Sequence, residues 1–171
     1  MWKKRKNQRF FFRLELDRLI EANRLAKQGK NVFKDRGVLE ILSVAYSFES
    51  INEWNGIYNN AQNLYEKFIS YARKMEISLP DKYIWLQANY EEIKRRNKLR
   101  QQERGQLLSE TDWIEESLIG KQIEFFRKMC IPENSDKVCL VDTNNMTKQE
   151  VLEAVCNLLK LQLKVYDRGE K

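Results

Sequence analysis

The sequence has no histidine, and it has only three cysteines, two prolines and six glycines among its 171 residues. Without histidine the chain cannot build a histidine-assisted nucleophilic triad, a histidine metal site or a histidine pH switch. Any catalysis must therefore rest on carboxylates, lysines, arginines or a borrowed metal ion. The scarcity of glycine and proline argues against long disordered or low-complexity stretches.

The cysteine spacing and the absence of long apolar runs exclude further classes of protein. Cys130, Cys139 and Cys156 form no CxxC pair, and each lies within or beside apolar residues, which favours reduced thiols. The apolar run near the start ends at Phe12, where charged residues follow, so it is too short for an export signal. No stretch approaches the roughly 20 apolar residues of a membrane helix. We therefore expect a cytoplasmic protein.

The composition is otherwise that of a folded protein, with 42% apolar and 33% charged residues. A chain of 171 residues can bury a sizeable core, and we expect a single domain over residues 1–171. The net charge of +6 comes largely from residues 1–36 and 94–104. A positive balance favours polyanionic partners, such as nucleic acid, a nucleotide or an acidic protein surface, and does not choose among them.

Apolar periodicity predicts an α/β fold in which helices alternate with a few short strands. The expected strands are residues 30–34, 82–88 and 137–142, and a helix follows each. Because well over a dozen residues separate successive strands, we expect a parallel sheet with right-handed crossovers. Thr147, with Glu150 three positions later, should cap the last helix. The other expected helices span residues 3–28, 38–50, 52–76 and 90–103. One more should begin at Ser109 or Thr111 and end at about residue 129.

Asp35 and Arg36 come directly after the first predicted strand. Ligands of parallel α/β sheets bind at the carboxyl ends of the strands. There an aspartate can accept a proton from a substrate hydroxyl, and an arginine can bind phosphate through its planar fork of donors. Alternatively, Asp35 caps the next helix and Arg36 forms a surface ion pair. The dipeptide alone leaves both interpretations open.

Four arginines lie within ten residues of the helix after the second strand: Arg95, Arg96, Arg100 and Arg104. Arg96, Arg100 and Arg104 share a face at helical spacing. Such a face can hold the oxygens of a phosphoryl group during transfer. It can equally be a solvated face paired with nearby glutamates, or a contact to nucleic acid.

Two further groups of side chains could contribute to a binding site. Thr143, Asn144 and Asn145 follow the third strand in a polar loop, which could border a purine or a ribose or could simply turn the chain into the capped helix. Trp54 and Tyr58 are aromatic residues at helical spacing, which favours core packing over a pocket that stacks a base.

In order and spacing, these segments resemble the P-loop nucleoside and nucleotide kinases, with thymidylate kinase and the deoxynucleoside kinases nearest in pattern. The matching stretches are NVFKDRG at 31–37, the arginine-rich segment 80–105, and DKVCLVDTNNMTKQEVLEAV at 136–155. The resemblance implies a helix-rich parallel sheet of P-loop kinase type with an arginine-rich lid at about 90–105. It also implies transfer of the γ-phosphoryl group of ATP, with Mg²⁺, to a nucleoside or nucleotide.

The resemblance assigns roles to individual residues as well. Asp35, Arg36, Trp54 and Tyr58 would bind the acceptor substrate, and no residue of this chain would ligate the metal. The lid arginines over the donor phosphates would be Arg95, Arg96, Arg100 and Arg104. The catalytic arginines would be Arg36, Arg96 and Arg100. The residues near the adenine of ATP would be Thr143, Asn144 and Asn145.

The sequence departs from that family because none of its six glycines belongs to a GxxxxGK[ST] phosphate loop. The chain resembles about the C-terminal three-quarters of such a kinase, without the first strand, the phosphate loop and the second strand. It would then be a truncated gene product, a fragment or a divergent relative, and we expect little or no kinase activity from it as printed. Two alternatives remain: a non-enzymatic basic helical module that binds nucleic acid, and a catalytically dead relative that acts as an interaction partner. In the latter, a second copy or another chain would complete the sheet.

Overall fold

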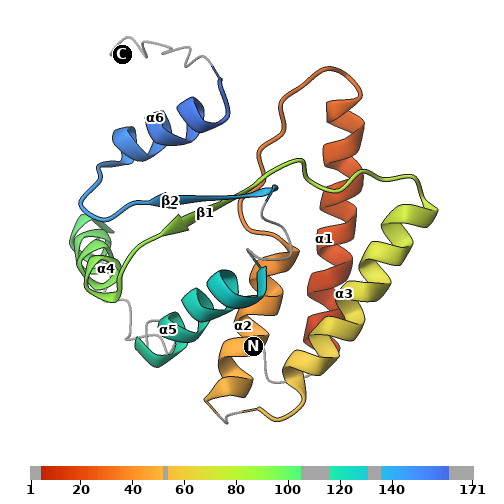
Figure 1. Ribbon diagram of the computed structural model, residues 1–171, viewed down its shortest axis with the longest axis horizontal. Coiled ribbons are helices and arrows are strands. Elements are labelled where there is room, and N and C mark those ends of the chain that lie inside the picture. The colour runs from red at the N-terminus through yellow and green to blue at the C-terminus, as the bar shows by residue number, and fades with distance from the viewer. Residues whose placement is uncertain (1–4, 52–53, 105–115, 131–135, 162–171) are drawn as a thin grey trace. The chain divides into compact units, whose positions relative to one another are not determined.

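The computed structural model describes residues 5–51, 54–104, 116–130 and 136–161. The chain is rich in helices, and its described strands form one small parallel sheet (Figure 1). The residues group into two compact units. Met1–Asp81 and Glu110–Ser135 form the first, which we call the helical unit. Lys82–Ser109 and Asp136–Lys171 form the second, which we call the sheet unit.

The helical unit is organised around α2 (Val38–Ser50), which packs against α1 (Arg5–Ala26), α3 (Ile57–Lys74) and α5 (Glu116–Phe125). A π-helical turn, η2 (Phe126–Cys130), continues α5. Because α2 is apolar on most of its circumference, it is buried on most sides, as expected of a central helix. Its buried apolar side chains are Val38, Leu39, Ile41, Leu42, Val44, Ala45 and Phe48.

The sheet unit contains β1 (Tyr83–Gln87), α4 (Tyr90–Arg104), β2 (Val138–Asp142) and α6 (Lys148–Leu158). The two strands are parallel and pair over their full length, so that both end at the same edge of the sheet. A helix follows each strand, as the sequence predicted. The coarser expectation of an α/β fold with parallel strands is therefore confirmed.

One edge of β1 has no neighbouring strand among the described residues. The backbone N–H of Tyr83 donates to the carbonyl of Lys137 on the β2 side (2.9 Å), so alternate residues of β1 direct their backbone groups to β2. The intervening residues, Ile84 and Leu86, direct theirs to the opposite edge. The Leu86 side chain is 50% exposed.

The first predicted strand is wrong. Residues 30–34 form no strand, and Val32 and Phe33 are 37% and 63% exposed. A short apolar run becomes a strand only when a neighbouring strand takes up its backbone hydrogen bonds, and no described residue does so here. Gly29, with φ of +76°, turns the chain after α1 instead.

The remaining predicted elements agree with the structure to within a few residues, with one change around Trp54. The helix expected over 52–76 begins at Ile57, so Trp54 precedes it and stacks on Phe48 of α2, with 4.0 Å between ring centroids. Ser109 and Thr111, which were expected to cap the next helix, lie outside the described residues.

Candidate functional site

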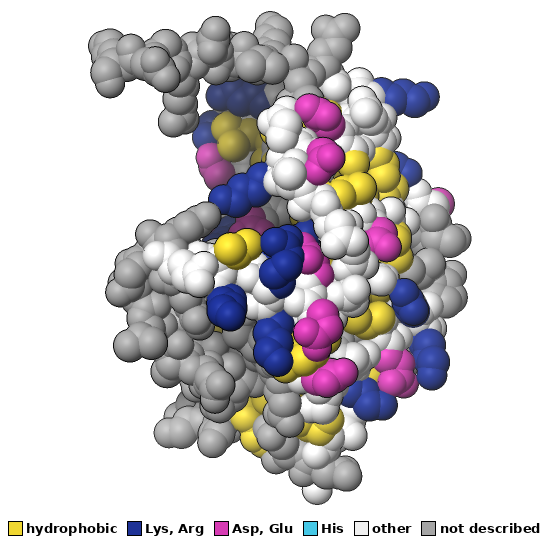
Figure 2. All heavy atoms as spheres, turned by 90° about the vertical axis from the view of Figure 1, so that its left-hand side faces the viewer, with side chains coloured by type: hydrophobic (Ala, Val, Ile, Leu, Met, Phe, Trp, Pro, Cys, Tyr) yellow, Lys and Arg dark blue, Asp and Glu magenta, His cyan; other side chains and the backbone are white. Residues whose placement is uncertain are grey.

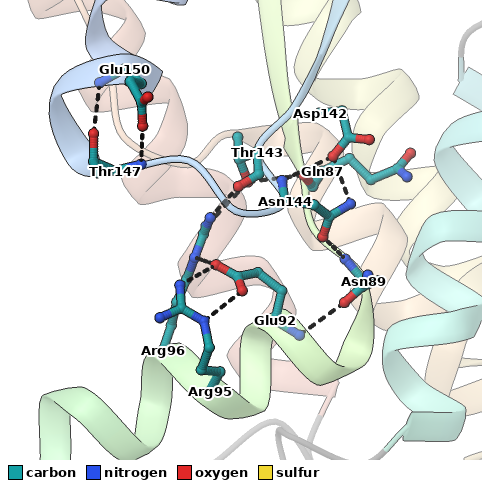
Figure 3. Close-up of polar contacts among 10 residues, drawn as sticks. All are labelled: Gln87, Asn89, Glu92, Arg95, Arg96, Asp142, Thr143, Asn144, Thr147 and Glu150. Carbon is teal, nitrogen blue, oxygen red and sulfur yellow. Dashed lines mark hydrogen bonds and ion pairs between the residues drawn. The ribbon is translucent and has the colours of Figure 1, made fainter.

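The polar residues that follow the two strands of the sheet unit lie together (Figure 3). Because β1 and β2 are parallel and end side by side, the segments after Gln87 and Asp142 emerge at the same edge. Thr143 donates to the carbonyl of Gln87 twice, from its backbone N–H (2.8 Å) and its hydroxyl (2.9 Å). Asn144 Oδ1 accepts from the backbone N–H of Asn89 (2.9 Å). These bonds join the two strand ends.

The loop between β2 and α6 is held by its own side chains. Asp142 Oδ1 accepts from the backbone N–H of Asn144 (3.0 Å) and from its side-chain amide (2.6 Å). Asn145 adopts φ of +58°, a left-handed conformation that asparagine tolerates better than most residues. Thr147 and Glu150 then form the predicted capping box of α6. The loop therefore has a defined shape before any ligand arrives.

Helix α4 brings a buried carboxylate to the same edge. The backbone N–H of Glu92 donates to Asn89 Oδ1 (2.8 Å), which caps the start of the helix. The Glu92 side chain is only 5% exposed, and a buried charge requires partners. Arg95 donates to it from Nε and Nη2 (both 2.7 Å), and Arg96 donates from Nε (2.7 Å).

Arg96 also reaches the loop after β2. Its Nη1 donates to the hydroxyl oxygen of Thr143 (3.1 Å), and its Nη2 donates to the Thr143 carbonyl. The Thr143 hydroxyl thus accepts from Arg96 and donates to Gln87 (Figure 3). All three nitrogens of the Arg96 guanidinium are used within the protein, so Arg96 joins α4 to the loop after β2.

The ion pairs of Glu92 set its charge state. Hydrogen bonds from Arg95 lower the pKa of Glu92 from its ordinary value of 4.5 to about 2. Burial acts in the opposite direction, and Arg96 adds to the lowering. The same contact raises the pKa of Arg95. At neutral pH the cluster therefore contains one carboxylate and two guanidinium groups.

An open hollow of about 400 Å³ lies between the start of α4 and the loop after β2. Its lining residues are all polar or charged, and they supply three amides, two carboxylates and one guanidinium. Such groups can hold a polar ligand through hydrogen bonds, and the guanidinium supplies positive charge for an anion. The lining residues are Asn89, Glu91, Glu92, Arg95, Asn144 and Asn145.

The structure brings part of the predicted site together. Arg95, Arg96 and the segment Thr143 to Asn145 meet in the sheet unit, and Arg95, Asn144 and Asn145 line the hollow. Arg100 and Arg104 belong to α4, but their side chains lie outside the described part of the chain.

The predicted acceptor residues belong to the helical unit. Asp35 and Arg36 are exposed and lie at a bend rather than at a strand end. Arg36 has φ of +65° and approaches Glu40, with 3.8 Å between Nε and Oε1. Burial raises the pKa of Glu40, against the effect of Arg36, and Asp35 and Glu15 contribute to the rise.

Trp54 and Tyr58 contact other aromatic residues of the helical unit. Tyr58 lies edge-on to Tyr46 (5.3 Å between centroids) and to Phe125 (6.2 Å). Its backbone N–H donates to Glu49 Oε2 (2.8 Å). These contacts agree with the core packing that the helical spacing favoured.

The sequence interpretation missed Asn89 and Glu92. Glu92 was grouped with the glutamates of a solvated helix face, whereas the structure buries it. The available signal was the spacing Asn89 to Glu92, an N-cap followed three residues later by glutamate, with Arg95 and Arg96 one turn further along. That pattern predicts a capped helix start with internal ion pairs.

No family model matches the chain, and neither a curated protein nor a solved structure matches it. Among the described residues, no group of three or more Cys, Asp or Glu side chains is arranged to hold a metal ion. No helix in the described ranges is both long enough and apolar enough to cross a membrane.

Proposed function

We propose that the chain is a nucleoside or nucleotide kinase-like domain whose sheet unit binds ATP, the phosphoryl donor. One observation carries this proposal. Arg95, from the helix after one strand, and Asn144 and Asn145, from the loop after its parallel neighbour, line one hollow at the shared carboxyl edge. This edge is where parallel α/β sheets bind ligands.

The side chains at the hollow suit the chemistry of ATP. An asparagine amide carries both a donor and an acceptor, which matches the edge of an adenine. Asn144 and Asn89 already use theirs within the loop and the helix cap, so among the described contacts Asn145 is the asparagine best placed for this role. A guanidinium group can bind phosphate oxygens or stack on a base. The carboxylate of Glu92 already serves two arginines, so Mg²⁺ would be held mainly by the phosphates of ATP rather than by this hollow. Catalysis would depend on positioning and on charge neutralisation.

Phosphoryl transfer also needs donors around the β-phosphate, and the sequence contains no GxxxxGK[ST] loop to supply them. We therefore expect little or no transfer to nucleosides or nucleotides by the chain as printed. A coupled assay for ADP release measures this directly. Turnover at ordinary kinase rates would contradict the expectation.

ATP binding can be tested with one charge change at the hollow. Asn145→Asp keeps a residue that tolerates the left-handed conformation and adds a negative charge beside the bound phosphates. We expect ATP affinity, measured by titration calorimetry, to fall about tenfold, the effect of roughly 1.4 kcal/mol. Asn157→Asp is the matched control, because it adds the same charge at an exposed position of α6.

Equal losses of affinity in both variants would indicate a general charge effect, and no ATP binding by the unmodified chain would refute the proposal. Loss confined to Asn145→Asp would support it.

The nucleic-acid alternative rests on the basic segments at residues 3–13 and 94–104. Two arginines of the second segment share Glu92, which leaves that cluster with a single excess positive charge. On the face drawn in Figure 2, the coloured Lys and Arg side chains are interspersed with Asp and Glu. This alternative requires affinity for single- or double-stranded DNA that falls steeply with salt and is unaffected by ATP.

The catalytically dead relative is the remaining alternative. In that case a second copy of the chain, or another protein, would complete the sheet at the edge of β1 that has no described neighbour.

A further inference from the structure

Arg95 and Arg96 have the same partner, Glu92, but use it differently. Arg96 uses Nε for Glu92 and both terminal nitrogens for Thr143. Arg95 uses Nε and Nη2 for Glu92, and its Nη1 donates to no described residue. The side chain of Arg95 is 54% exposed, against 28% for Arg96. Of these two arginines, Arg95 therefore has a nitrogen, Nη1, with no partner among the described residues, and its side chain is the more exposed.

Arg95 supplies the positive charge at that position. Glu92 is shared by two guanidinium groups. Glu91 adds a second carboxylate to the lining of the hollow, so the attraction for an anion comes from the Arg95 guanidinium alone and not from a net positive lining. Arg95 lines the hollow and Arg96 does not. Glu92 grips the Nε and Nη2 edge of Arg95 in the two-point geometry that fixes a guanidinium plane. The Nη1 group, which has no described partner, therefore belongs to a guanidinium of fixed orientation, so little conformational entropy is lost when it binds a ligand.

We propose that Glu92 is a positioning residue that holds Arg95 as the anion-binding arginine of the hollow, whereas Arg96 joins α4 to the loop after β2. The anion is a phosphate group, and its assignment to a nucleotide rests on the proposed function. Of the two adjacent arginines, the ligand contacts Arg95.

The test compares matched variants of the full 171-residue chain. Inorganic tripolyphosphate and ATP serve as separate probes in titration calorimetry, and thermal unfolding of each variant is recorded in parallel. Arg95→Lys keeps the charge but loses the planar fork. We expect tripolyphosphate affinity to fall about tenfold, since a charge-assisted hydrogen bond is lost, with little change in melting temperature. Arg96→Lys should lower the melting temperature and leave the affinity nearly unchanged.

Glu92→Gln separates positioning from charge. If Glu92 acted only through its charge, its removal beside the hollow would strengthen the binding of an anion. If Glu92 positions Arg95, Glu92→Gln weakens binding about tenfold despite the more positive cluster, because the guanidinium is no longer held. A merely structural Glu92 would lower the melting temperature and leave the affinity unchanged.

Tighter or unchanged binding in Glu92→Gln would overturn the positioning role. Equal effects of Arg95→Lys and Arg96→Lys on affinity, or no binding of tripolyphosphate at millimolar concentration, would overturn the assignment of the anion. Arg95-dependent binding of tripolyphosphate without any binding of ATP would support this inference and refute the proposed function. If ATP binds and Arg95→Lys leaves its affinity unchanged, the result would refute this inference and support the proposed function.

Discussion

At the scale of single residues, the sheet unit depends on Glu92, which two adjacent arginines share although their other contacts differ. Breaking a buried ion pair by removing one partner leaves a charge without compensation, which is costly. Glu92 is 5% exposed, so water can compensate only part of the loss of its arginine partners. The pair Arg95 and Arg96 therefore contributes to stability in a way that depends on the ionised state of one carboxyl group.

This dependence predicts a loss of stability in acid. The folded pKa of Glu92 is lowered from 4.5 to about 2, so the unfolded state binds the proton first as the pH falls. The stabilisation is fully present above pH 4.5 and is lost as the pH falls toward about 2. Urea unfolding across this window should show a shallower pH dependence in Glu92→Gln than in the unmodified chain. Identical pH dependence in the two proteins would contradict the assignment.

The helical unit supplies a parallel case for comparison. Hydrogen bonds from Lys121 and then Tyr46 lower the pKa of Glu124 to about 2. Glu124→Gln should remove a separate part of the same acid sensitivity. Because the two carboxylates have no partner in common, we expect the two changes to be additive.

Sequence analysis named three of the residues that line the hollow, and their roles stay predictions. Asn144, Asn145 and Arg95 were named because polar and basic residues follow predicted strands. The different fates of Arg95 and Arg96 could not be read from spacing, because they depend on which donor reaches Thr143. That contact requires the register of β1 against β2, which is a property of the folded chain.

At the scale of elements, α6 orients the loop that borders the hollow. Thr147 Oγ1 accepts from the backbone N–H of Glu150 (3.2 Å), and Glu150 Oε2 accepts from the backbone N–H of Thr147 (2.7 Å). The capping box was predicted from sequence because its two residues are three positions apart and need no tertiary partner.

Removing this cap should destabilise the sheet unit. We expect Thr147→Ala to lower the free energy of unfolding by about 1 kcal/mol, the usual cost of losing an N-cap side chain. Thr147→Ser is the control, because serine retains the hydroxyl and should remain close to the unmodified chain. Urea titration followed by circular dichroism measures both. A serine variant as unstable as the alanine variant would show that the methyl group, rather than the cap, matters.

A predicted strand was correct where a neighbouring strand pairs with it and wrong where no described strand does. Residues 82–88 and 137–142 were correctly assigned, and each stabilises the other in the structure. Residues 30–34 have a similar apolar pattern but no described strand beside them. A local pattern cannot say whether a neighbour exists, so this error could not be avoided from sequence.

At the scale of the whole molecule, the two-stranded sheet leaves apolar side chains uncovered. Parallel strands are normally buried on both faces, yet Leu86 and Leu140 are 50% and 42% exposed. In the parallel register they lie on opposite faces, because Leu86 pairs with Val141 and Leu140 pairs with Trp85. No described strand takes up the outward backbone groups of Ile84 and Leu86.

We expect the chain to associate through this edge of β1. Leu86→Lys places a charge on the edge and should reduce association in sedimentation velocity across a concentration series. Leu140→Lys is the matched control, because it adds the same charge to a similarly exposed leucine of the other strand. Equal effects of both changes would point to general surface adhesion, and a monomer at every concentration would contradict the prediction.

The division into two compact units was not foreseen, because the sequence shows no boundary of composition. Each unit is built from segments far apart in the chain: residues 110–135 return to the helical unit, and residues 136–171 return to the sheet unit. Contacts of this kind are set by tertiary packing and leave little local signal.

The contact of Arg96 with Thr143 has a consequence for local unfolding. Thr143 holds Gln87 through two bonds and Arg96 through two more, so the loop cannot open without releasing both β1 and α4. The start of α4, the ends of both strands and the loop should therefore open together as one cooperative unit. A ligand that ordered any one of these segments would slow amide hydrogen exchange in all of them.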